Sequence, residues 1–192
     1  EEIPCSCEYI SVLDTVMMTW SVVHTSGAPP CPRYGHGTTL VGSKVYLFGG
    51  RNATDVFNDL YVLDLETLHW EEILPFGTLL PPPLELVGLC HCAIDEKSAL
   101  VVTGGRAPGI NTDKLAVYYF YIETSYWHVL PFNCAPGNRR IAPAICNITS
   151  SKRRPSTGSL KRLPYEFGAV LQLLVVGGDR GVEDDGRACT PS

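Results

Sequence analysis

The chain has 192 residues, of which 45% are hydrophobic and 18% are charged. This composition provides enough apolar side chains for a folded core and excludes wholesale disorder. The formal charge of −5 argues against a general nucleic-acid-binding surface. No apolar run approaches the ~20 residues of a membrane helix, so we expect neither a membrane nor a nucleic acid as a direct partner.

The content of 18 Gly and 15 Pro favours short strands joined by turns over long helices. The eight cysteines are interpreted as small buried hydrophobic residues in a reducing compartment. Two glycosylation sequons, Asn52-Ala53-Thr54 and Asn147-Ile148-Thr149, favour secretion instead. We predict a cytoplasmic protein, with the nucleus as the alternative and secretion disfavoured. Because the sequence opens with Glu1 rather than Met, we expect it to be a processed or cut piece.

The first predicted element is a pair of strands between residues 9 and 23. Asp14 precedes Trp20 by six residues, and the same spacing separates Asp64 from Trp70. A similar segment later in the sequence ends at another tryptophan. Separations of 50 and 57 residues between successive tryptophans indicate an internal repeat carried by Trp20, Trp70 and Trp127.

The next unit is predicted to hold four strands, at 37–41, 45–48, 59–65 and 70–74. A glycine-led turn at 42–44 joins the first two. An apolar run ends in a pair of glycines in three units, at Gly49-Gly50, Gly104-Gly105 and Gly177-Gly178. Such a pair permits positive φ and lets a neighbouring ring approach closely, while the tyrosines and tryptophans fill the gap between stacked sheets.

One four-stranded sheet cannot bury both faces alone, so repeated sheets stack around an axis as a propeller. The pattern resembles the kelch repeat from about Tyr9 to Arg180, on Arg33-Tyr34-Gly35-His36, Gly49-Gly50, Tyr61, Leu63-Asp64, Trp70, His91, Gly104-Gly105, Trp127 and Gly177-Gly178. The predicted fold class is all-β, a kelch-type β-propeller with four antiparallel strands per blade. This protein would supply about three to four blades of a partial ring, and missing sequence or another polypeptide would supply the remaining blades.

We expect residues 1–192 to be part of one propeller with four sections. They are a half blade at 9–23, a blade at 33–74, a blade at 88–132 and a half blade at 141–180. The last section departs from the kelch pattern, because a basic insertion at 149–168 separates its strands. Pro143 stands where the second section has His36, and no closing tryptophan follows.

Arginines recur where kelch blades expose loops. Arg51 and Arg106 follow glycine pairs directly, and Arg180 follows one after an aspartate. Arg33 and Arg140 stand at the entry to first strands, which lies on the same rim. Because guanidinium groups bind carboxylates with two parallel hydrogen bonds, these five residues are predicted to bind a protein partner, an acidic peptide or a polypeptide C-terminus. The alternative is that each arginine pairs locally, for example with Asp55, Asp59 or Asp179.

His36 and His91 each lie thirteen residues before a glycine pair. We interpret them as matching structural hydrogen-bonding residues inside the ring. Cys90 and Cys92 beside His91 lack the spacing of a zinc site, and no hydrolase, phosphate-loop or dinucleotide motif is present. We therefore predict no catalytic residue, no metal, no cofactor and no enzymatic activity.

The predicted function is a protein–protein interaction module or scaffold that binds through its rim loops. These are Arg33 to Gly35, Arg51 to Phe57, Arg106 to Lys114 and Arg180 to Asp185. The kelch resemblance implies one concrete role, the recruitment of substrates to a larger complex such as a ubiquitin ligase. The alternative is the kelch portion of an enzyme, either copper oxidase-like or a modifying enzyme whose catalytic domain lies elsewhere.

Overall fold

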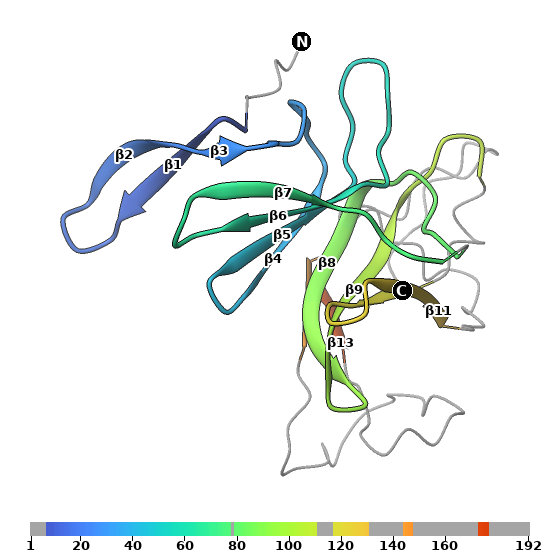
Figure 1. Cartoon of the computed structure of the whole chain (residues 1–192). Coiled ribbons are helices and arrows are strands. Elements are labelled where there is room, and N and C mark those ends of the chain that lie inside the picture. The colour runs from blue at the N-terminus through green and yellow to red at the C-terminus, as the bar shows by residue number, and fades with distance from the viewer. Residues whose placement is uncertain (1–6, 78, 111–116, 131–143, 148–172, 177–192) are drawn as a thin grey trace.

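The computed structural model describes residues 7–77, 79–110, 117–130, 144–147 and 173–176 (Figure 1). Every regular element in these ranges is a β-strand, which confirms the predicted all-β class. Within the same ranges, no helix has the length and apolar character needed to cross a membrane.

The strands form four sheets that follow one another along the sequence. The first is the hairpin of β1 (Tyr9–Asp14) and β2 (Thr19–His24). The second contains β3 (Ser26–Gly27), β4 (Gly37–Val41), β5 (Lys44–Phe48), β6 (Leu60–Asp64) and β7 (His69–Ile73). The third contains β8 (Glu85–Ile94), β9 (Lys97–Arg106), β10 (Val117–Tyr121) and β11 (Tyr126–Leu130). The last is the hairpin of β12 (Ala144–Asn147) and β13 (Leu173–Val176).

Consecutive strands from β4 to β7 and from β8 to β11 are antiparallel neighbours, as the four-stranded repeat predicts. The observed bounds of β4 to β7 agree with the predicted strands to within one residue. The short β3 was not predicted; it runs parallel to the outer strand β7 and ties the first hairpin to the second sheet. The sheets fan out as an arc and do not close into a ring (Figure 1).

The main core lies between the second and third sheets. Phe48 of β5 is fully buried, and its ring centroid lies 5.4 Å from that of Trp127 on β11. Trp127 also packs at 5.1 Å on Phe120 of its own sheet. Because side chains alternate between the faces of a strand, one face of the second sheet contributes this set of buried residues, Tyr46, Phe48, Leu60 and Val62.

The opposite face of the second sheet packs toward the first hairpin. Trp70 is buried there with Leu47 and Leu63, and its indole Nε1 donates a hydrogen bond to the carbonyl of Cys7 at 3.1 Å. Trp70 and Trp127 therefore both face the preceding sheet, and each is only 4% exposed. Trp20 is 69% exposed, because the described residues include no sheet in front of the first hairpin.

The glycine pairs adopt the left-handed conformation that the repeat predicts, with φ of 67° and 92° at Gly49 and Gly50 and of 69° and 89° at Gly104 and Gly105. The group that approaches Gly49 closely is not the aromatic ring that the sequence predicts. A Cβ on Gly49 would lie 2.6 Å from the carbonyl oxygen of Leu84, which is backbone of the next linker and not an aromatic ring. This approach allows the Gly50 N–H to donate to the same carbonyl at 2.8 Å.

The strand register shows that the predicted equivalence of His36 and His91 is wrong. Gly37, directly after His36, pairs with Phe48, whereas His91 pairs with Leu100 in the middle of its hairpin. The β8–β9 hairpin extends two residues further at its turn than β4–β5, so counting back from the glycine pair reaches a different level. Each arm of the hairpin is two residues longer, so His91 lies four residues beyond Val87, the residue that pairs with Gly104. An even shift keeps each side chain on its face, which is why the sequence pattern conceals it.

Part of the fourth section lies outside the described residues. The strands β12 and β13 are antiparallel and fall within the half blade predicted at 141–180. The insertion at 149–168 and the third glycine pair at 177–178 are not among the described residues. The section boundaries of the propeller therefore stay predictions.

Replacing Phe48 with Ala should destabilise the protein by about 3–5 kcal/mol, because a cavity opens against Trp127 between two sheets. Leu40→Ala, at a side chain that is 57% exposed, is the control and should cost less than about 1 kcal/mol. Urea unfolding followed by tryptophan fluorescence measures both. Equal losses in the two variants would contradict the stacking of sheet on sheet.

Candidate partner-binding rim

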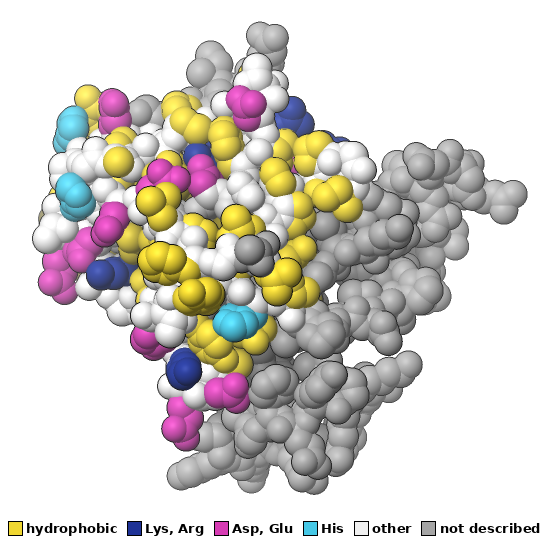
Figure 2. Space-filling view, turned by 45° about the vertical axis from the view of Figure 1, so that its right-hand side comes forward, with side chains coloured by type: hydrophobic (Ala, Val, Ile, Leu, Met, Phe, Trp, Pro, Cys, Tyr) yellow, Lys and Arg dark blue, Asp and Glu magenta, His cyan; other side chains and the backbone are white. Residues whose placement is uncertain are grey.

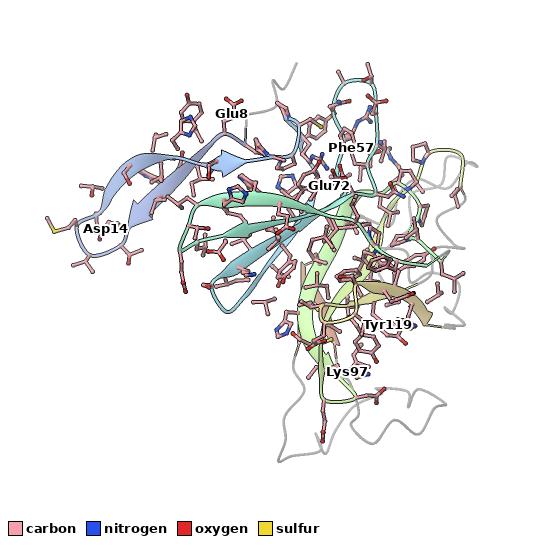
Figure 3. All side chains as sticks on the ribbon, in the orientation of Figure 1. Glu8, Asp14, Phe57, Glu72, Lys97 and Tyr119 are labelled. Atoms are coloured by element: carbon pink, nitrogen blue, oxygen red, sulfur yellow. The ribbon has the colours of Figure 1, made fainter. Side chains whose placement is uncertain are left out.

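The arginines of the predicted rim lie at the ends of strands, because Arg33 precedes β4, Arg51 follows β5 and Arg106 is the last residue of β9. Three of them, Arg33, Arg51 and Arg106, are among the described residues, and the structure gives them two different environments. Arg140 and Arg180 lie outside the described residues. The loop at 49–59 projects from the top of the molecule in Figure 1, and Phe57 marks its base in Figure 3.

Arg33 is a buried residue, and its side chain is 1% exposed. Its guanidinium forms a two-pronged ion pair with Asp59, at 2.5 Å to Oδ1 and 2.9 Å to Oδ2. A further N–H donates to the carbonyl of Gly49 at 3.0 Å. The group also lies over the ring of Phe57, 4.1 Å from its centroid. Arg33 therefore clasps both ends of the 49–59 loop.

The pairing of Arg33 with Asp59 is the local ion pair that was the alternative to ligand binding. Arg33 therefore does not converge with the other arginines on a ligand. Burial opposes the charge of Arg33, but hydrogen bonding and Coulomb attraction to Asp59 outweigh it and raise the pKa of the guanidinium. The charge is thus permanent and internally neutralised. The prediction that Arg33 offers its side chain to a partner is corrected, because that side chain is enclosed by its own loop.

Arg51 and Arg106 are brought together by Glu85. Nη1 of Arg51 lies 3.2 Å from one carboxylate oxygen, and Nε of Arg106 lies 2.6 Å from the other. The Glu85 side chain is only 5% exposed, whereas those of Arg51 and Arg106 are 30% and 54% exposed. Two cations share one buried carboxylate, so one positive charge of this group of three is not compensated.

The backbone explains why these three residues meet. Arg106 is the last residue of β9 and pairs directly with Glu85, the first residue of β8. Arg51 forms a pair of backbone hydrogen bonds with Tyr34, each of 2.9 Å. Beyond it the side-chain oxygen of Asn52 accepts the N–H groups of Thr54 and Asp55, which closes the loop tip.

Glu85 was not predicted as a site residue. The longer β8–β9 hairpin moves it further from its glycine pair than Tyr34, which occupies the matching pairing position opposite Arg51. One feature of the sequence does indicate Glu85 as a site residue. Glu85 is the one acidic residue in the apolar run from Leu84 to Ile94, and a buried charge of this kind needs a partner.

His36 lies beside the clasp and is partly buried. Burial, and then the positive charge of Arg33, lowers its pKa from the ordinary value of 6.5. Its Nδ1 atom is buried without a hydrogen-bond partner in the described part of the protein. His91, by contrast, shares a 2.8 Å hydrogen bond with the Ser98 hydroxyl.

The described cysteines include Cys92, which is fully buried. Burial raises the pKa of its thiol to about 12, so the thiolate that acts as nucleophile or metal ligand does not form. No group of three or more candidate metal ligands is found among the described residues.

The sequence was compared with known proteins. The model of the KLHDC2/KLHL20/DRC7 Kelch-repeats domain matches residues 4–151. The chain belongs to the kelch-repeat family. Its fold is accordingly a kelch-type β-propeller, of which the described sheets form an open arc. The kelch match covers the second and third sheets and the rim residues Arg33, Arg51, Glu85 and Arg106.

Individual relatives match different shares of the sequence. Rat host cell factor 1 is 39% identical over 169 residues, 78% of this chain and 7% of the relative. Bovine kelch domain-containing protein 2 is 41% identical over 70 residues, 36% of this chain and 17% of the relative. Acyl-CoA-binding domain-containing protein 6 of rice is 39% identical over 97 residues, 50% of this chain. The chain spans only 14% of that rice protein.

Replacing Arg33 with Met should destabilise the kelch arc by about 3 kcal/mol, because Asp59 and the Gly49 carbonyl lose their donors inside the fold. The control is Lys97→Met at an exposed position, which should cost less than about 1 kcal/mol. Urea unfolding measures both. An unfolding free energy for Arg33→Met equal to that of the parent protein would rule out the clasp.

His36 should make the fold sensitive to acid. Because its folded-state pKa is lowered, the unfolded protein binds the proton more readily, and stability falls as pH drops below 6.5 toward the folded pKa. Above that range the residue is neutral in both states and has no such effect. NMR titration of the imidazole should give a midpoint below 6.5, and His36→Gln should lessen the stability loss on acidification. A midpoint above 6.5 would contradict the burial argument.

Proposed function

We propose that this kelch arc is a protein-interaction module that binds an acidic segment of a partner through Arg51 and Arg106. The observation that carries the proposal is the sharing of one buried carboxylate by two partly exposed guanidinium groups. Glu85 holds both planar groups in place but cannot neutralise both. An incoming carboxylate would therefore meet donors that are already oriented, which reduces the ordering cost of binding.

The burial of Glu85 sharpens this argument. An exposed ion pair is weakened by water and salt, but a carboxylate that is only 5% exposed keeps its hold on the two arginines. The outer edge of Arg106, more than half exposed, remains available for a ligand. Arginine presents several N–H donors in a fixed fork, so it can bond to Glu85 and to a second carboxylate together.

The wider role of the kelch module is also a proposal. Binding through the rim fits a scaffold or the substrate-recruiting part of a larger complex, such as a ubiquitin ligase, in the cytoplasm or nucleus. In this role the kelch module binds and has no catalytic activity of its own. In that role the remaining blades, from further sequence or another polypeptide, complete the ring and cover the exposed face of Trp20.

The rim proposal is tested with a fluorescent peptide rich in Asp and Glu, compared with its Asn and Gln counterpart. Arg106→Ala should weaken binding of the acidic peptide by roughly tenfold, as expected for loss of a charge-assisted hydrogen bond, and added salt should weaken it further. Fluorescence anisotropy gives the affinities. Lys97→Ala is the control, because Lys97 lies at the opposite end of the molecule from the loop base at Phe57 (Figure 3). Unchanged affinity in Arg51→Ala and Arg106→Ala would overturn the proposal.

A second variant tests the electrostatic role of Glu85. Glu85→Gln retains the shape of the side chain but leaves one acceptor oxygen for the two guanidinium groups, and two uncompensated cations on the rim. Affinity for the acidic peptide should then rise by roughly tenfold or less, on the scale of one charge-assisted contact. Circular dichroism checks that the variant is folded. A folded Glu85→Gln variant with reduced affinity would show that the arginines bind only when the carboxylate orients them.

A further inference from the structure

The linker that joins the second and third sheets carries exposed apolar side chains. Leu79 and Leu80 are 60% and 44% exposed, and Pro83 is exposed as well. The sheets on both sides of this linker are described, so a missing neighbour does not explain the exposure. The linker runs along the right-hand side of the described sheets in Figure 1, and Figure 2, which brings that side forward, shows hydrophobic side chains over the middle of the surface.

The residues of this linker dictate an extended backbone. Three consecutive prolines stand at 81–83. Each proline fixes its own φ at about −65° and keeps the residue before it out of the helical region. Because Leu80, Pro81 and Pro82 each precede a proline, residues 79–84 form a polyproline II segment with about three residues per turn. This polyproline segment lies between β7 and β8 and belongs to neither strand.

Burial along the polyproline segment follows the same period of three. Pro81 is fully buried, and so is Leu84 three residues later. Between them Pro82 is partly buried and Pro83 is exposed. A polyproline II helix has three edges, and the edge formed by Pro81 and Leu84 faces the protein. The other two edges carry the exposed side chains of the segment. They are Leu79 with Pro82, and Leu80 with Pro83.

Hydrogen bonds hold the buried edge of the segment in place. The Pro81 carbonyl accepts from the side-chain amide of Asn58 at 3.1 Å. The Leu84 N–H donates to the Phe57 carbonyl at 2.9 Å, and the Leu84 carbonyl accepts from the Gly50 N–H at 2.8 Å. All three partners belong to the loop after β5. The segment is therefore fixed before any partner arrives, which lowers the entropy cost of binding.

The linker between the first hairpin and the second sheet shows what the backbone itself requires. Each linker has a fully buried proline shortly before it reaches the rim, Pro30 in the first and Pro81 in the second. The two residues before that proline differ, because residues 28–29 are Ala-Pro and residues 79–80 are Leu-Leu. The buried proline is common to both linkers and serves the fold. The two exposed leucines are particular to the second linker, so joining the sheets does not account for them.

Charge beside the polyproline segment selects the kind of partner. Glu85 follows the segment directly and holds the partly exposed guanidinium groups of Arg51 and Arg106. Pro83 and Glu85 are two residues apart, a span of about 6 Å at polyproline II spacing. Cations therefore stand at the carboxyl end of the two outward edges. A groove that receives these edges gains from carboxylates placed next to the arginines.

We propose that residues 79–83 are a preformed ligand for a partner domain of the SH3 type, with an aromatic groove flanked by acidic side chains. Domains of this class bind polyproline II segments because the conformation is already formed and little entropy is lost. Two edges of the segment enter the groove, while the third stays on the kelch arc. The acidic flank rests on the proposed function of Arg51 and Arg106, whereas the polyproline segment is an independent observation.

The test uses the whole protein and a panel of purified SH3 domains that carry Asp or Glu beside the groove. The linker variant Leu79→Gln, Leu80→Gln removes apolar side chains from both outward edges and retains every proline. Isothermal titration calorimetry should show that the parent protein binds at least one domain of the panel. The linker variant should bind that domain at least about tenfold more weakly, from the loss of buried apolar area.

A control variant removes two leucines of matching exposure elsewhere. It is Leu40→Gln, Leu65→Gln, at side chains that are 57% and 40% exposed near the hairpin turns of the second sheet. The control should bind the domain as the parent does. The charge argument is tested with Arg106→Ala, which should weaken binding of the domain by roughly tenfold, as expected for loss of a charge-assisted contact.

Three results would overturn the inference. They are failure of every domain in the panel to bind the parent protein, equal affinity in the linker and control variants, and unchanged affinity in Arg106→Ala. The acidic peptide separates this inference from the rim proposal, because the linker variant should bind that peptide as the parent does. Peptide binding without domain binding would reject the polyproline ligand alone. Domain binding that needs the leucines and Arg106, without peptide binding, would reject the rim site alone.

Discussion

Contact between consecutive sheets is the constraint on which the rest of this structure depends. A four-stranded sheet with two apolar faces is unstable in water unless both are covered, and here Phe48 meets Trp127 on one side while Trp70 meets the first hairpin on the other. Close approach is possible only because Gly49 has no Cβ where the Leu84 carbonyl comes nearest. The large rings fill the interface, and the glycines let the backbones meet at its end.

The same contact between sheets organises the charges at the rim. The Gly49-Gly50 pair ends β5 and begins the loop that carries Arg51, while the linker it touches leads into Glu85 of the next sheet. The Arg51–Glu85 ion pair therefore joins two sheets, and Arg106 adds a second cation from the same sheet as Glu85. Arg33 contributes indirectly, because its buried pair with Asp59 holds the loop on which Arg51 stands. Stability and the proposed binding chemistry are thus connected through one loop.

The two ends of the strands have different chemistry. The loops after the glycine pairs hold partly exposed arginines, and the hairpin turns hold carboxylates, with one apolar tip at Val16-Met17-Met18. Strand β6 separates these ends, since it runs from the 49–59 loop to the turn at 65–68.

The kelch pattern, the strand positions in the second sheet and the left-handed glycines followed from the sequence, because alternation, turn residues and repeated aromatics act over short distances along the backbone. The partners of the arginines did not. Arg33 and Arg51 were predicted on the same rim, yet one is enclosed by Asp59 and Phe57 and the other is partly exposed. Glu85 lies opposite Arg106 because the β8–β9 hairpin extends two residues further at its turn than β4–β5. The register of this hairpin is set by the pairing between its strands. Local periodicity determines which segments become strands, whereas only packing between distant segments decides which charges meet and which side chains remain exposed.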